Sequence, residues 1–147
     1  MSIIRHELQA NCPPSRIWAL LADLGAVQTY NPMVRSTRIL GATSSGVGAV
    51  RECDLRPSGE VSERVIHWEE GRAIGFEVVK SEFPFHFMRW ITCLEVSEQG
   101  CRITQDLEYQ PKFGPLGWLL DRLVMRRKLR SNLDQVFAAL IKGLAAK

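Results

Sequence analysis

Apolar and polar residues alternate over most of the first 111 residues, whereas apolar residues recur every three or four positions after residue 112. Alternation with a period of two is typical of half-buried strands, because successive side chains point to opposite faces of a sheet. The pattern predicts strands at residues 2–11, 33–40, 48–55, 61–68, 74–80, 85–96 and 102–110. Short turns between consecutive strands predict hairpins, and therefore an antiparallel sheet of seven strands.

Two short helices are predicted after the first strand. Pro13 and Pro14 stop that strand and favour the first turn of a helix, whose apolar face includes Trp18. Gly25 is expected to end this helix, since glycine adopts the backbone conformation that follows many helices. A second short helix is predicted at residues 26–30 and is closed by a proline at residue 32.

The helical spacing of leucines near the C-terminal end predicts one long helix over residues 113–147. About thirty helical residues span roughly 45 Å, which is longer than a small domain needs for a simple cap. The helix is therefore expected to lie along the sheet. This order of elements predicts an α+β fold, and a bent sheet held away from a long helix would leave room for a small apolar molecule.

The composition predicts one globular domain covering residues 1–147. Apolar residues make up 46% and charged residues 24%, which is ordinary for a chain of 147 residues with its own core. No apolar run approaches the length of a membrane span, and no secretory signal is evident, so the expected location is cytoplasmic. The four cysteines have no zinc-ligand spacing and are expected to be free thiols, so neither a metal nor a cofactor is predicted.

Basic residues are concentrated in the predicted C-terminal helix. From Lys112 onward, eight Lys and Arg residues stand against two Asp residues. The densest group is Arg126, Arg127, Lys128 and Arg130. A solvated helix face explains this group, and weak contact with an anionic membrane or an acidic partner is the alternative. Nucleic-acid binding is not predicted, because the basic run lacks interleaved aromatic residues. A monomer and a homodimer both stay open.

The phase of alternation places four polar side chains on the predicted inner face of the sheet: Arg51, Glu63, Gln105 and Tyr109. A buried charge is costly unless it is paired, so Arg51 and Glu63 on adjacent strands are expected to meet. Such a pair would orient a polar ligand group inside an apolar pocket whose wall includes Phe76, Trp90 and Leu107. A structural ion pair at the cavity rim is the alternative.

Further candidates lie on the sixth predicted strand and in two loops. His86, Met88 and Trp90 are predicted to share the interior face with Leu94 and Val96. His86 is the histidine best placed for proton transfer, since imidazole titrates near neutral pH. Four residues are predicted to lie at the cavity entrance: Tyr30, Asn31, Gly46 and Gly48. The two glycines favour either a mobile lid or an ordinary hairpin turn, and no Walker lysine follows them to bind phosphate.

The order of several short motifs resembles a known family. These motifs are residues 14–24 (PSRIWALLADL), 30–32 (YNP), 46–51 (GVGAVR) and 63–65 (ERV). Together with the C-terminal helix, they resemble the polyketide cyclase/dehydrase and lipid transport branch of the START-like superfamily, also called SRPBCC. The resemblance covers essentially the whole chain. It implies a helix-grip fold, in which a seven-stranded curved antiparallel sheet wraps the C-terminal helix around a hydrophobic cavity. It also implies binding of lipids, polyketides or sterols.

Three functions compete at this point. The first is a noncatalytic binding module for a small apolar ligand, in which Arg51 and Glu63 orient one polar group. The second is an aromatic polyketide cyclase or dehydratase, in which Glu63, His86 or Tyr109 transfers protons and Arg51 stabilises an enolate. The third is a protein that presents a lipid or quinone at a membrane surface, and its support is the basic group in the C-terminal helix.

Overall fold

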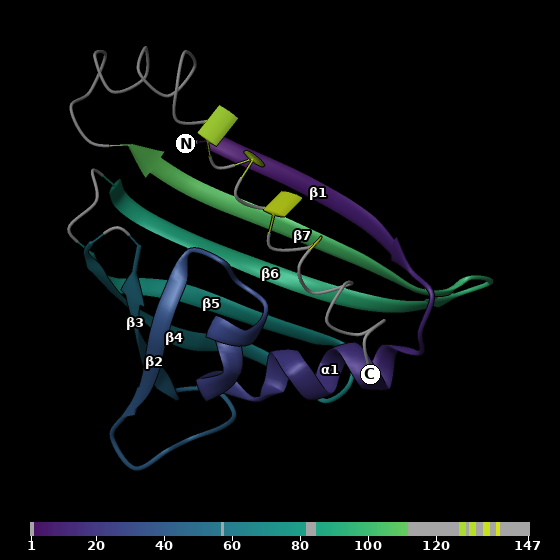
Figure 1. Cartoon of the computed structure of the whole chain (residues 1–147), viewed down its shortest axis with the longest axis horizontal. Coiled ribbons are helices and arrows are strands. Elements are labelled where there is room, and N and C mark those ends of the chain that lie inside the picture. The colour runs from purple at the N-terminus through teal and green to yellow at the C-terminus, as the bar shows by residue number, and fades with distance from the viewer. Residues whose placement is uncertain are drawn as a thin grey trace.

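The computed structural model describes residues 2–56, 58–81 and 85–111, together with residues 127, 128, 130, 131, 134, 135 and 138. For residues 2, 85, 86 and 111 it describes only the backbone. Within these ranges the element order is β1, α1, η1 and then β2 to β7 (Figure 1). The strands are β1 (Ser2–Ala10), β2 (Val34–Leu40), β3 (Val50–Leu55), β4 (Glu60–Glu69), β5 (Ala73–Ser81), β6 (Phe85–Ser97) and β7 (Gly100–Pro111).

The seven strands form one antiparallel sheet with the order β1-β7-β6-β5-β4-β3-β2. Consecutive strands from β2 to β7 pair as hairpins, and β1 closes the other edge by pairing with β7. The predicted antiparallel sheet is therefore confirmed. Figure 1 shows that the sheet is strongly bent, so that one of its faces is concave.

Two short helices connect β1 to β2. The α-helix α1 (Pro14–Ala22) starts with a proline in its first turn, as predicted. The prediction that Gly25 ends it was wrong, because α1 already ends at Ala22 and Gly25 lies inside the 3-10 helix η1 (Leu24–Thr29). The 3-10 helix η1 begins at Leu24, one residue before Gly25, so the position of the glycine predicted the wrong end for α1.

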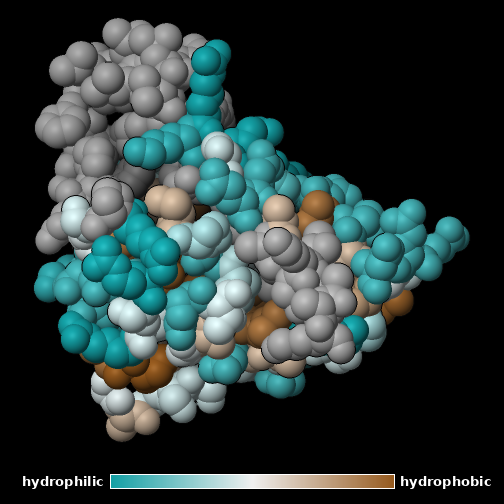
Figure 2. Space-filling view, in the orientation of Figure 1, coloured by the Kyte–Doolittle hydropathy of each residue, from teal (hydrophilic) through white to brown (hydrophobic). Residues whose placement is uncertain are grey.

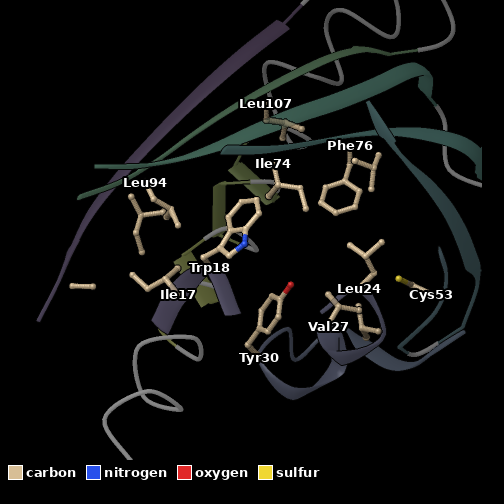
Figure 3. Packing of buried hydrophobic residues seen from close by; sticks show 14 of the residues in the cluster. Ile17, Trp18, Leu24, Val27, Tyr30, Cys53, Ile74, Phe76, Leu94 and Leu107 are labelled. Atoms are coloured by element: carbon tan, nitrogen blue, oxygen red, sulfur yellow. The ribbon is translucent and has the colours of Figure 1, made fainter. Parts of the chain in front are cut away.

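The core lies between the concave face and these two helices. Ile17 and Trp18 of α1 and Leu24 of η1 pack in one apolar cluster with the inward side chains of the sheet. Figure 3 shows Ile74 and Leu107 of this cluster on the sheet side. The helices therefore cover part of the concave face and close one end of it.

The strand hairpins mostly follow the predicted phase, with one clear exception. Val96 was predicted to face the interior, but it is 83% exposed. It lies beside the tight turn in which Ser97 pairs with Gly100, at the end of the β6–β7 hairpin. This hairpin tip extends away from the helices in Figure 1, so alternation no longer selects a buried face there.

The described residues near the C-terminal end are helical at all seven positions. Asp134 lies against β1, because its Oδ1 is 2.6 Å from Nε2 of His6. This contact places position 134 next to β1. The predicted continuous helix over 113–147, and the helix-grip arrangement that depends on it, lie mostly outside the described residues.

Two further observations concern cysteines and membranes. All four cysteines are free, as predicted, and Cys12, Cys53 and Cys101 are buried. Among the helices that the structure describes, none has both the length and the apolar character needed to cross a bilayer.

Candidate functional site

An Arg–Glu pair occupies the concave face where β3 meets β4. Arg51 and Glu63 are directly opposite each other in the antiparallel register. Nε of Arg51 donates a hydrogen bond of 2.8 Å to Oε1 of Glu63, so the predicted contact is present. The two side chains are only 5% and 12% exposed. The sequence forms this pair because both residues alternate in phase with the buried Cys53 and Val65.

An aromatic wall continues from this pair across the sheet. Cζ of Arg51 lies 4.1 Å from the ring centroid of Phe76, which is within cation–π range. The rings of Phe76 and Trp90 are 5.5 Å apart between centroids and inclined by 31°. Trp90 in turn is opposite Leu107 in the register. The three residues predicted as apolar wall therefore form one row that runs from β5 to β7.

Tyr30 approaches the Arg51–Glu63 pair from the helical side. We call these three residues, together with Cys53, the concave-face cluster. The sequence placed it at a cavity entrance, but its side chain is buried at the end of η1. Figure 3 shows its hydroxyl pointing toward the sheet residues Ile74 and Phe76. Burial raises the pKa of Tyr30, while the charge of Arg51 and a side-chain hydrogen bond with Arg51 partly oppose that rise. The hydroxyl is therefore neutral at physiological pH and lies within hydrogen-bond reach of Arg51.

Burial and neighbouring charges determine whether Arg51 and Cys53 are ionised. Burial has the largest single effect on the pKa of Arg51 and lowers it, but the charge of Glu63, the contributions of Tyr30 and Cys53, and the hydrogen bond to Glu63 together outweigh burial, so the net shift is upward and the guanidinium stays charged. Burial, followed by the negative charge of Glu63, raises the pKa of the Cys53 thiol to about 12. Cys53 therefore remains a neutral thiol beside the ion pair.

One donor of Arg51 is left over. Its Nη1 atom is buried and has no hydrogen-bond partner among the residues that the structure describes. Buried polar groups in native proteins are nearly always paired, and an unpaired one calls for an explanation. A bound molecule that supplies an acceptor at this position would provide it.

A second polar row crosses the concave face closer to β1. Oγ1 of Thr92 donates a hydrogen bond of 3.0 Å to Oε1 of Gln105, its partner in the register. Gln105 is opposite His6 on β1, and His6 contacts Asp134. The sequence predicted Gln105 on the inner face but missed Thr92, because a threonine in a strand fits either face.

The three predicted acid–base residues come from separate parts of the sheet. Glu63 lies on β4 and Tyr109 on β7, with β5 and β6 between these strands. Tyr109 is fully buried. His86 is in β6, but its side chain lies outside the described residues. Among the residues that are described, no group of His, Cys, Asp and Glu is arranged to hold a metal ion.

The predicted entrance loop has an ordered base. Gly46 and Gly48 have φ values of 79° and 96°, which only glycine adopts without strain. The amide of Gly48 donates to the Val65 carbonyl at 2.9 Å, so the loop is fastened to β4 at this end. Asn31 is half-buried, and its Oδ1 accepts a hydrogen bond of 3.0 Å from the Met33 amide. Asn31 therefore shapes a turn.

The convex face and the basic group have the character of solvated surfaces. Opposite charges alternate across four neighbouring strands in one register row of the convex face: Arg64, Glu77, Arg89 and Glu108. In the basic group, Arg127, Lys128 and Arg130 are helical and exposed, and Arg126 lies outside the described residues. In the view of Figure 2, the visible apolar residues form separate areas between hydrophilic ones.

A family model described as polyketide cyclase/dehydrase and lipid transport matches residues 1–145. The chain belongs to this family. The match agrees with the START-like resemblance of the sequence and covers all of the concave-face cluster. No curated protein sequence matched the chain.

Several solved structures have the same fold as this family member. The crystal structure of TTHA0849 from Thermus thermophilus superposes with a TM-score of 0.81 at 19% identity, covering 99% of this chain and 98% of that one. The crystal structure of Ara h 8.0201 gives 0.80 at 16% identity and covers 99% of both chains. The structure of XoxI from Bacillus cereus gives 0.77 at 14% identity, with 97% and 94% covered. At these identities the likeness shows the fold alone.

Proposed function

We propose that this family member binds a small, largely apolar molecule against the concave face of the sheet, and that Arg51, Glu63 and Tyr30 orient a polar group of that molecule. The observation that carries this proposal is the buried Arg51–Glu63 pair in an otherwise apolar wall. The family description, which includes lipid transport, supports an apolar ligand. The predicted cavity stays a prediction, since residues 112–147 would form one of its walls.

Energetics explain why the pair points to a function. Two charges lose their hydration when they are buried, and their mutual attraction often only repays that cost. In other proteins, apolar residues of similar volume have often stabilised the fold at least as well as the buried ion pair that they replaced. A charged pair that folding does not require is therefore best explained by a ligand group that it contacts.

The row beside the pair supports the apolar character of the ligand. Phe76, Trp90 and Leu107 form a continuous apolar row adjacent to the guanidinium. Binding sites for small molecules commonly combine such a surface with a few convergent polar groups. A ligand lying along this row would bury its apolar body on the wall and bring one polar end to Arg51.

Two neighbouring valines allow a matched test of location. Val78 is opposite Glu63 in the register and packs against the core, whereas Val79 is 40% exposed. We expect wild type to bind the neutral dye N-phenyl-1-naphthylamine saturably, with enhanced fluorescence. Val78→Trp should weaken this binding at least about tenfold, because a bulky ring would occupy space beside the pair. Val79→Trp should leave it unchanged.

Two results would defeat the proposal. One is the absence of saturable dye binding by folded wild-type protein, together with no ligand in native mass spectra after exposure to a lipid extract. The other is equal loss of binding in Val78→Trp and Val79→Trp. Catalysis of a cyclase type, lipid presentation at a membrane, and a cytoplasmic location remain predictions from the sequence.

A further inference from the structure

The concave-face cluster contains one positive and one negative charge. The groups with the largest electrostatic effects on the pKa of Arg51, after burial itself, are Glu63, Tyr30 and Cys53. Tyr30 and Cys53 are uncharged at neutral pH, because the pKa values of both are raised, and Glu63 forms the ion pair with Arg51. The cluster is therefore electrically balanced before any ligand binds.

The cluster nevertheless has an unused hydrogen-bond donor. Glu63 accepts a hydrogen bond from Nε of Arg51, which leaves the buried Nη1 without a partner among the described residues. Nη1 is part of a guanidinium, which has five N–H donors and no acceptor. The missing partner must therefore be an acceptor.

From this balance and this unused donor we infer which ligand group the site selects. This inference rests on the proposed function and adds the chemical class of the ligand's polar group. We propose that this group is an uncharged oxygen acceptor, such as a ketone, ester or hydroxyl oxygen, and that the site discriminates against carboxylates and other anions.

The discrimination follows from the cost of burying net charge. A carboxylate at Nη1 would leave two negative charges around one guanidinium in a largely apolar environment. Like charges at short range destabilise each other there, and the ligand would also lose its hydration. A carbonyl oxygen satisfies the same donor, leaves the charges balanced, and loses far less hydration on burial.

A set of three probes of similar shape tests this directly. 2-Acetylnaphthalene has a neutral acceptor, 2-naphthoate has a carboxylate, and 2-ethylnaphthalene has no acceptor. Each competes with N-phenyl-1-naphthylamine for wild-type protein at pH 7.5. We expect the ketone to bind at least about tenfold more tightly than either of the others, since a hydrogen bond to a charged donor has that effect.

A change of one charge should reverse the preference. Glu63→Gln removes the negative charge but keeps an acceptor near Nε, so the cluster gains a net positive charge. In this variant we expect 2-naphthoate to bind at least as tightly as 2-acetylnaphthalene. The matched control is Glu108→Gln, which removes the partner of the exposed Arg89 on the opposite face and should preserve the wild-type order.

The outcomes separate this inference from the function on which it rests. If all three probes displace the dye but 2-naphthoate binds wild type as tightly as the ketone, the inference is overturned and the binding function stands. If ketone and hydrocarbon bind equally, the role of Nη1 as a donor is overturned. If the dye itself does not bind, both proposals fail.

Two controls complete the experiment. Far-UV circular dichroism establishes that Glu63→Gln is folded. An Arg51→Met/Glu63→Leu variant, whose cluster has no charge, should lose the preference for the ketone altogether.

Discussion

Two Arg–Glu pairs join neighbouring strands of this sheet with similar geometry in opposite surroundings. Nε of Arg51 donates to Glu63 at 2.8 Å, and Nε of Arg89 donates to Glu108 at the same distance. Both pairs are directly opposite in the register. The side chains of the first pair are 5% and 12% exposed, whereas those of the second are 52% and 30% exposed.

An aromatic ring lies beneath each guanidinium as well. Arg51 lies 4.1 Å from the ring centroid of Phe76, and Arg89 lies 5.7 Å from that of Phe87. The difference between the two sites is therefore one of environment more than of composition. On the outer face, water solvates the charges of Arg89 and Glu108, and this pair contributes little to the free energy of unfolding. Inside, each charge depends on its partner, and the buried Nη1 of Arg51 has no hydrogen-bond partner among the described residues.

Removing one arginine should give the largest contrast between the pairs. Arg51→Met leaves Glu63 as a buried, unpaired charge, so we expect the free energy of unfolding to fall by about 3–5 kcal/mol. Arg89→Met should lower it by about 1 kcal/mol at most. Urea denaturation followed by circular dichroism measures both values. Similar losses in the two variants would contradict the assigned difference in environment.

Truncating the aromatic partner should have a smaller effect with the same asymmetry. Phe76→Leu removes buried ring contacts with Trp90 and the cation–π contact with Arg51, for a loss of roughly 1–2 kcal/mol in the free energy of unfolding. Phe87→Leu, on the half-exposed side, should cost roughly 0.5 kcal/mol. The same denaturation experiment compares them. A larger loss for Phe87→Leu would reverse the expected order.

Alkaline pH should weaken the interior cluster. The thiol of Cys53 has a pKa of about 12 in the folded protein against an ordinary value of 9.0, because of burial and the Glu63 charge. Above pH 9 the unfolded chain loses this proton before the folded chain does. The stabilisation that comes from the neutral Cys53 thiol is therefore fully present below pH 9 and is lost as the pH rises above it. We expect a loss of about 1 kcal/mol by pH 10.

The control for this effect is Cys53→Ala. Its stability should decline less steeply between pH 8 and pH 10 than that of wild type, although its stability at pH 7 is lower. The burial of Tyr30 acts in the same direction and leaves a residual slope. Parallel pH profiles for the two proteins would show that Cys53 does not ionise as its surroundings suggest.

Replacing the whole interior pair should change stability least. In Arg51→Met/Glu63→Leu the buried charges are removed together, so we expect a free energy of unfolding within about 1 kcal/mol of wild type. The corresponding outer-face variant, Arg89→Met/Glu108→Leu, should also remain folded. Denaturation of both variants tests this. A large loss in the interior variant alone would mean that the pair is required for folding, and would remove the argument that it indicates a function.

The sequence predicted the strands well because strand alternation is a local signal. Arg51 and Glu63 could be placed inside because their neighbours at two-residue spacing are apolar or small. The same argument is ambiguous for Arg89, whose neighbours at that spacing are Phe87 and Ile91. The interior phase predicted for Met88 and Trp90 implies that Arg89 points outward, and the register agrees, because it places Arg89 between Glu77 and Glu108.

The parts that the sequence missed depend on contacts between distant residues. The burial of Tyr30 follows from the way η1 packs against the sheet, which no local pattern specifies. The unpaired Nη1 of Arg51 depends on the exact pairing of one hydrogen bond. Val96 was misplaced because strand alternation continues into a hairpin tip that has no core beside it.

The most direct test of the account is a crystal structure of the protein with 2-acetylnaphthalene. We predict that the naphthalene ring lies along Phe76, Trp90 and Leu107, and that the carbonyl oxygen lies about 3 Å from Nη1 of Arg51. A ketone bound elsewhere, or an Nη1 atom that remains without an acceptor beside the bound ligand, would contradict the account.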